Sequence, residues 1–101
     1  MTEKFRKVYE KTKSELLDYL KEILKGKKNI RVNKPIQMIR YNYDYFSDFL
    51  VTYKLKRVFV EDNNILIEIE DEDGDCDESY LKDESLDTVI RIILLIEALD
   101  N

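Results

Sequence analysis

The sequence predicts a two-layer α+β fold, with a helix at each end and an antiparallel meander of three to four strands between them. Apolar residues recur at three- and four-residue spacings near both ends of the chain, which is the helical period. In the middle of the chain they recur at every second position, which is the strand period. The 101 residues contain two glycines and one proline, so we expect a single domain over residues 1–101 with no flexible linker.

Residues 3–25 predict an amphipathic helix. Thr2 is the expected N-cap, because its hydroxyl can accept a hydrogen bond from a free N–H of the first turn. Gly26 suits the position just after the helix, where the chain often turns with a positive φ. The stripe positions are Phe5, Val8, Tyr9, Thr12, Leu16, Tyr19, Leu20 and Ile23.

The next segment is harder to interpret. Residues 36–41 predict a strand, and Pro35 marks an edge or a break, because proline cannot donate a hydrogen bond to a neighbouring strand. Residues 42–52 could form a short helix, a wide aromatic loop or the start of the following strand, and the sequence leaves these three alternatives open.

A hairpin is predicted over residues 53–60 and 65–71, joined by the polar turn 61–64. Both segments alternate apolar and polar residues, so one face should be buried and the other hydrated. Asp73-Gly74 indicates a second turn, after which residues 76–81 predict a short closing strand.

In the second strand of that hairpin, Ile65, Ile67 and Ile69 share one face, whereas Glu68 and Glu70 share the other. We expect the isoleucines to face the core and the glutamates to face water, because side chains alternate with a period of two. The predicted fold depends on this assignment.

Residues 86–99 predict the second helix, with Ser85 as its N-cap. Its apolar residues cover more of the circumference than one stripe, which is typical of a helix buried on two sides. Two explanations remain open. Either the sheet and the first helix cover it, or a second copy of the chain does, in a homodimer with contacts at Ile92, Leu95 and Leu99.

The residue types exclude several chemistries. The chain has no histidine, which removes histidine-assisted nucleophiles and histidine metal sites. Its single cysteine, Cys76, cannot build a metal cluster, and Asp75 and Asp77 should disfavour its thiolate. We therefore expect no enzymatic activity, no catalytic residue and no cofactor.

The location is predicted from what the sequence lacks. The N-terminal residues are polar and charged, which is unlike a signal peptide. The longest apolar stretch, residues 89–99, is interrupted by Arg91 and Glu97 and is too short to cross a bilayer. One cysteine without an internal disulfide fits a reducing compartment, so we expect a cytoplasmic protein with no membrane association.

Charge is divided unevenly along the chain. Residues 1–60 carry 15 Lys and Arg against 7 Asp and Glu, a net charge of +8, whereas residues 61–101 carry 2 against 15, a net charge of −13. Either the basic face of the first helix lies near the acidic loops and the charges cancel internally, or the acidic half faces a basic partner.

The densest acidic segment, residues 68–78, is the predicted binding surface. We expect a non-enzymatic interaction or accessory protein that binds an unidentified basic partner protein through this face, with an affinity that falls as salt rises. The residues expected to bind are Glu68, Glu70, Asp73, Asp75, Asp77 and Glu78.

Nucleic-acid binding by residues 25–57 is the alternative. This stretch holds nine Lys and Arg against two acidic residues, and aromatic residues are interleaved with them, as in proteins that bind single strands. Two points count against it: the whole chain has a net charge of −5, and the aromatic residues are also expected in the core. They are Tyr41, Tyr43, Tyr45, Phe46, Phe49 and Tyr53.

The aspartates around Gly74 partly resemble a calcium loop, which needs oxygen ligands and a sharp glycine turn. With Gly74 at the sixth loop position, Ile69 is first and Tyr80 is twelfth, and neither supplies the expected carboxylate. We therefore predict a hydrated acidic turn without a specific metal site. Whether this turn attracts cations weakly stays open.

Overall fold

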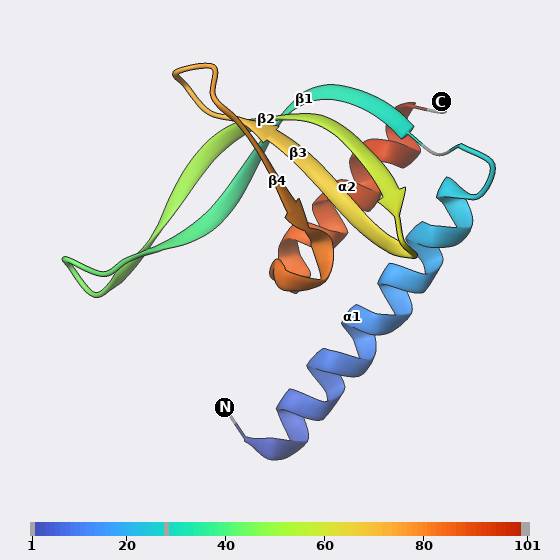
Figure 1. Ribbon diagram of the computed structural model, residues 1–101. Coiled ribbons are helices and arrows are strands. Elements are labelled where there is room, and N and C mark those ends of the chain that lie inside the picture. Colours follow the sequence, from blue (N-terminus) through green and yellow to red (C-terminus); the bar gives the residue numbers. More distant parts are fainter. Residues whose placement is uncertain (1, 28, 100–101) are drawn as a thin grey trace.

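Four antiparallel strands and two helices make up the fold, in a computed structural model that describes residues 2–27 and 29–99 (Figure 1). The sheet order is β1-β2-β3-β4, so β1 and β4 are the two edges. The predicted two-layer α+β class, with a helix at each end and an antiparallel sheet between, is confirmed. The elements are α1 (Glu3–Leu24), β1 (Asn29–Asn42), β2 (Ser47–Glu61), β3 (Asn64–Glu70), β4 (Cys76–Tyr80), the short 3-10 helix η1 (Leu81–Asp83) and α2 (Leu86–Leu99).

Helix α1 begins and ends close to the predicted positions, but its stripe is buried unevenly. The Thr2 hydroxyl accepts a hydrogen bond from the backbone N–H of Phe5 at 3.2 Å, which confirms the N-cap. Leu20 and Leu24, near the end of the helix, are buried. Phe5 and Val8 are each 58% exposed, because the first half of α1 projects beyond the rest of the molecule (Figure 1).

Residues 43–46 form an aromatic hairpin turn and residues 47–52 begin β2, so the loop and the strand start both occur and the short helix does not. The Asn42 side-chain oxygen accepts hydrogen bonds from the backbone N–H groups of Asp44, at 2.9 Å, and Tyr45, at 3.3 Å. These bonds hold the turn. Residues 36–53 of the β1–β2 hairpin are called the arm below. Ile36 and Met38 at its base are buried in the core, whereas its tip extends away from the helices (Figure 1).

Strand β1 begins earlier than the sequence indicated. Its pairing with β2 shifts register between Arg31 and Lys34, where Asn33 has a φ of +52°. Pro35 lies within the strand, on an edge of the sheet, as proline requires. Bulges of this kind insert one extra residue and increase the local twist of the strand.

The β2–β3 hairpin confirms the predicted turn at residues 61–64 and the alternation that follows it. Asp62 and Asn63 both have positive φ angles, of 50° and 64°, as a two-residue hairpin turn requires. Ile65, Ile67 and Ile69 are buried and lie opposite Val60, Val58 and Leu55 of β2, so the isoleucines face the core as expected.

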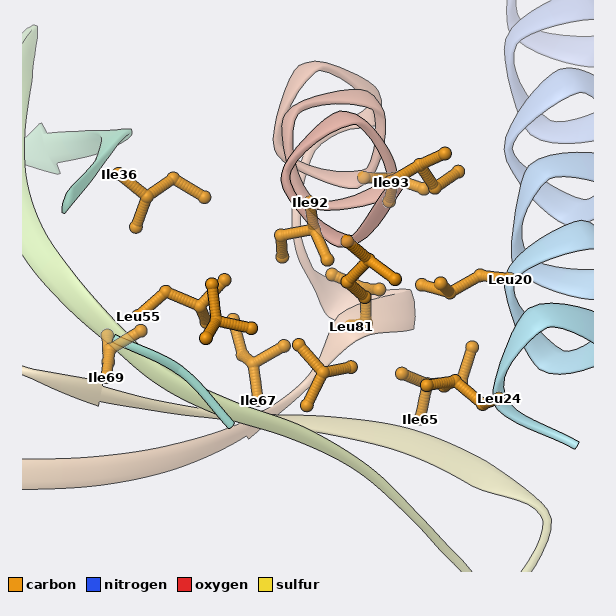
Figure 2. Close-up of a cluster of buried hydrophobic side chains, with 14 of the residues drawn as sticks. Leu20, Leu24, Ile36, Leu55, Ile65, Ile67, Ile69, Leu81, Ile92 and Ile93 are labelled. Carbon is orange, nitrogen blue, oxygen red and sulfur yellow. The ribbon is translucent and has the colours of Figure 1, made fainter. Parts of the chain in front are cut away.

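The core lies between the sheet and the two helices. Figure 2 shows Ile36, Leu55, Ile67 and Ile69 of the sheet pointing toward Ile92 and Ile93 of α2, with Leu20 and Leu24 of α1 alongside. Helix α2 packs against both β1 and α1, which explains why so much of its circumference is apolar.

This packing corrects the predicted dimer contact. Ile92 is fully buried inside the monomer, so it is not available to a second copy, and the prediction for this residue was wrong. Leu95 is partly buried against the same core, whereas Leu99 is 40% exposed. The sheet and α1 cover Val89, Ile92, Ile93 and Ile96, as the other explanation proposed, whereas Ile90, Leu94 and Leu99 stay exposed by 40% or more.

Neither of the two helices within residues 2–27 and 29–99 is both long and apolar enough to span a bilayer.

Candidate functional site

The predicted acidic face is divided between the two sides of the sheet. Glu68 and Glu78 lie on the outer face, where each forms an ion pair with Arg57 of β2, at 3.3 Å and 3.2 Å. Glu70, on the same face, pairs with Lys56 at 3.2 Å. These three glutamates therefore neutralise neighbouring cations instead of forming a free acidic surface.

The same ion pairs explain how the two oppositely charged halves of the chain come together. Arg57 belongs to the basic half and contacts acids on two later strands. Its guanidinium also lies 4.1 Å from the centre of the Phe59 ring, which it covers. The charges cancel across β2, β3 and β4.

The remaining acids lie in and beside the β3–β4 turn, residues 71–75. One Asp71 carboxylate oxygen accepts hydrogen bonds from the backbone N–H groups of Asp73 and Asp75, both at 2.9 Å. Gly74 has a φ of +85°, which explains why glycine occupies this position. Asp77 follows in β4, opposite Ile69, and so lies on the inner face of the sheet.

A groove of about 560 Å³ lies between this turn and the arm, on the inner face of the sheet. Val51, Tyr53 and Ile69 contribute its apolar floor, and Arg40 and Ser79 lie beside them. Acidic residues form the wall on the side of the turn: Asp71, Glu72, Asp73, Asp75, Asp77 and Glu78. The carboxylate of Glu78 turns to the outer face, where Arg57 pairs with it. Within the described part of the chain, the other five acids of this wall have no cationic partner.

Glu84 connects the two edges of the sheet beside this groove. Its carboxylate accepts hydrogen bonds from the guanidinium of Arg40 on β1, at 3.1 and 3.4 Å, and from the Ser79 hydroxyl on β4, at 3.3 Å. Burial lowers the pKa of Arg40, but its interactions with Glu84 and Tyr53 outweigh burial and raise the pKa above its ordinary value. No periodicity or spacing in the sequence indicated this connection.

The acidic turn has some features of a cation site. Asp71, Asp73 and Asp75 each place one carboxylate oxygen within 4.8 Å of the others, and all three residues are exposed. One Asp71 oxygen is already used by two backbone N–H groups. Exposed carboxylates at such distances are expected to attract cations weakly, without the surrounding ligands of a specific site.

Cys76 has a raised pKa, as the sequence predicted, but for a different reason. Desolvation raises the pKa of the thiol, and the negative charges of Glu70 and Glu68 raise it further, whereas Lys56 lowers it. The sequence had indicated Asp75 and Asp77 as the cause. Glu70 is the residue directly opposite Cys76 in the sheet, with its carboxylate 3.9 Å from the sulfur.

Among the aromatic residues of the arm, Tyr53 is partly buried against the core, but those nearer the tip are exposed, contrary to the expectation that the core needs them. Tyr43 and Phe46 are 80% exposed and Tyr45 is 79% exposed. Residues 41–53 contain two acids and no Lys or Arg. The cations of residues 25–57 lie outside the aromatic turn, and Arg40, Lys56 and Arg57 are engaged by glutamates.

No family model, characterised protein sequence or solved structure matches this chain. The assignment of function therefore depends on the chemistry of its own surfaces. The groove with its acidic wall, the exposed aromatic turn and the free edges of the sheet are the features to be explained.

Proposed function

We propose that this protein is a non-enzymatic interaction module that holds a basic segment of a partner protein in the groove between the arm and the β3–β4 turn. The observation that carries the proposal is the acidic wall of that groove. Five of its six carboxylates have no cationic partner among residues 2–27 and 29–99. Clustered acids of one sign attract an oppositely charged partner and favour its association.

The floor of the groove supports the same choice of ligand. Val51, Tyr53 and Ile69 offer apolar surface next to the carboxylates. Lysine and arginine side chains have apolar stems and charged ends, so a basic segment can lay its stems on the floor while the charges reach the wall. Arg40 would oppose a cation, but Glu84 already neutralises it.

The expected setting is the cytoplasm. Cys76 is a free, exposed thiol, which fits a reducing compartment better than an oxidising one. A basic partner protein in that compartment is the ligand that we propose.

A peptide titration tests the proposal. We expect a short oligolysine peptide to bind in calorimetry at low salt, and the combined Asp73→Asn, Asp75→Asn and Asp77→Asn variant to bind at least about tenfold more weakly. The matched control neutralises Glu10, Glu15 and Glu22, three exposed acids of α1, and removes the same total charge. Equal losses in the two variants, or no binding by the unmodified protein, would contradict the proposal.

Nucleic-acid binding by residues 25–57 is a second candidate, because exposed rings such as Tyr43 and Phe46 are available for stacking on bases. The absence of Lys and Arg from residues 41–53 weakens it, since phosphates require cations near the rings. A gel shift at low salt with single-stranded and duplex oligonucleotides separates the two candidates. A shift abolished by Tyr43→Ala and Phe46→Ala would favour this second function.

A further inference from the structure

The first half of α1 extends beyond the rest of the fold (Figure 1). The hydrogen bonds and ion pairs that residues 3–8 form with described residues all stay within α1 and its N-cap. The body of the protein first reaches the helix one turn later, where the Tyr9 hydroxyl accepts a hydrogen bond from the backbone N–H of Leu86 at 2.8 Å. Lys13 then donates to the backbone carbonyl of Lys82.

This projecting part of the helix carries an uncovered row of weakly polar and apolar side chains, called the apolar row below. Phe5, Val8 and Thr12 make up the row, because residues three and four positions apart lie along one side of a helix. Phe5 and Val8 are each 58% exposed. The same stripe is buried further along, at Leu20 and Leu24. Neighbouring exposed apolar side chains that continue a buried stripe are typical of an interaction surface.

A row of lysines flanks the apolar row. Lys4, Lys7 and Lys11 have the same three- and four-residue spacing, shifted by one position. All three are exposed, and none has a hydrogen-bond or ion-pair partner in the described part of the chain. Glu3 and Glu10, the acids of the same turns, lie on the opposite side of the helix from the apolar row. The positive charge beside the apolar row is therefore not cancelled locally.

We propose that this surface binds an acidic amphipathic helix of a partner protein, which packs its apolar side on Phe5 and Val8. The carboxylates of the partner helix then lie beside the lysine row. Residues 2–13 carry five Lys and Arg against two Glu, a net charge of +3 in a chain whose total is −5. A local surplus of one sign attracts a partner of the opposite sign. The surface shares no residue with the groove, and the inference does not rest on the function proposed above.

The position of α2 favours a helix as the ligand. Phe5 lies one turn before Tyr9 on the same side of α1, and Tyr9 contacts the first residue of α2. A partner helix beside residues 3–12 would extend the helical layer past the start of α2, packed side chain against side chain as α2 packs on α1. A flat lipid surface is obstructed on this side of α1, because α2 and η1 stand there.

Charge disfavours a second copy of this chain at the same surface. Two α1 helices packed through their apolar rows would bring two lysine rows together, and like charges at this spacing repel. An acidic partner replaces that repulsion with attraction. A contact along about three turns of one helix is smaller than the roughly 800 Å² per partner of a standard interface. We therefore expect binding in the micromolar range at low salt, and weaker binding as salt rises.

Calorimetry with a synthetic peptide tests the proposal. The probe is a peptide of about 14 leucines and glutamates, with the leucines at three- and four-residue spacings so that they form one side of a helix. A scrambled peptide of the same composition lacks this period and should not bind. Two variants, Phe5→Ser with Val8→Ser and Lys4→Gln with Lys7→Gln and Lys11→Gln, should each raise the dissociation constant of the probe at least about tenfold.

Matched controls remove the same groups from other surfaces. Leu50→Ser with Leu94→Ser removes two apolar side chains that are 64% and 60% exposed. Lys25→Gln with Lys34→Gln and Lys54→Gln removes three exposed lysines. Both control proteins should bind the probe like the unmodified protein, and circular dichroism checks that every variant folds.

Nuclear magnetic resonance locates the bound peptide. The probe should shift the amide signals of residues 3–12 and leave those of residues 71–79 unchanged. The proposal is overturned if the unmodified protein does not bind the probe, or if the control variants lose as much affinity as the α1 variants. It is also overturned if vesicles containing phosphatidylserine bind through Phe5 and Val8 while the probe does not, because the ligand of α1 is then a membrane.

Discussion

Single polar side chains define the turns of this protein. Asp71 accepts two backbone hydrogen bonds and so determines the shape of the β3–β4 turn, and Asn42 does the same in the turn of the arm. Short Asp and Asn side chains are suited to this, because they reach backbone N–H groups two or three residues further along. In this turn, Asp71 therefore has a structural role, while Asp73 and Asp75 supply charge.

Replacing Asp71 should separate these roles. We expect Asp71→Ala to lower the free energy of unfolding by about 1 kcal/mol, because two exposed backbone N–H groups lose their acceptor. Asp73→Ala should change it by less than about 0.5 kcal/mol, because its carboxylate accepts no comparable bonds. Urea unfolding measures both. Equal effects would show that the Asp71 bonds do not stabilise the turn.

Cys76 illustrates what sequence neighbours can and cannot predict. The sequence correctly indicated an acidic environment and a raised pKa, but attributed the effect to Asp75 and Asp77. Adjacent residues in a strand point to opposite faces, so Asp77 lies away from the sulfur and the cross-strand Glu70 lies close to it. Strand register determines this contact, and register is not visible in the sequence alone.

The contacts between α1 and α2 join elements that are far apart in the sequence. The Tyr9 hydroxyl accepts a hydrogen bond from the backbone N–H of Leu86, at 2.8 Å, and so satisfies a free donor at the start of α2. Further along both helices, the Tyr19 hydroxyl donates to the carboxylate of Glu97. Tyrosines that appeared as part of an apolar stripe therefore connect the helices through their polar ends.

The Tyr19 contact should make stability depend on alkaline pH. The hydrogen bond to Glu97 raises the pKa of Tyr19 above its ordinary 10.0, and the charge of Glu97 and desolvation add to this. Because the folded protein holds the proton more tightly than the unfolded chain, this stabilisation is complete below pH 10 and is lost as pH rises through the raised value. Tyr19→Phe should lose less stability than the unmodified protein between neutral and strongly alkaline pH.

Thermal unfolding across that pH range measures the difference. Tyr45→Phe is the control, because Tyr45 is exposed in the turn between β1 and β2. A Tyr19→Phe curve parallel to that of the unmodified protein would contradict the assigned contact.

The elements differ in how well the sequence predicted them. Both helices and the β2–β3 hairpin were placed closely, because their apolar residues recur with a clear helical or strand period. The first half of β1 was missed, since the bulge near Asn33 and Pro35 interrupt its alternation. The start of β2 was ambiguous because residues 43–50 are exposed on both faces and so show no period.

In the whole molecule, α2 occupies the centre of the core. Val89, Ile92 and Ile96 are buried, and they face a sheet whose inner positions are also aliphatic. The sequence indicated that α2 must be covered on two sides, but it did not show which elements cover it. That question depends on how α1 packs, and helical periodicity does not determine the packing partner.

Substitutions in α2 should reflect this arrangement. We expect Ile92→Ala to lower the free energy of unfolding by about 2–4 kcal/mol, because it leaves a cavity in a closely packed core. Leu94→Ala, at an exposed position two residues further along, should change it by no more than about 0.5 kcal/mol in dilute solution. Chemical denaturation compares the two. A small effect at Ile92 would contradict the assigned core.

Glu84 couples the position of one free edge of the sheet to the position of the other. Its carboxylate holds Arg40 on one outermost strand and Ser79 on the other, beside the groove. A ligand that displaced β4 would therefore alter the position of β1 as well. Thermodynamic reciprocity requires that, if a basic peptide in the groove changes the affinity of the β1 edge for any ligand, that ligand changes the affinity for the peptide by the same factor.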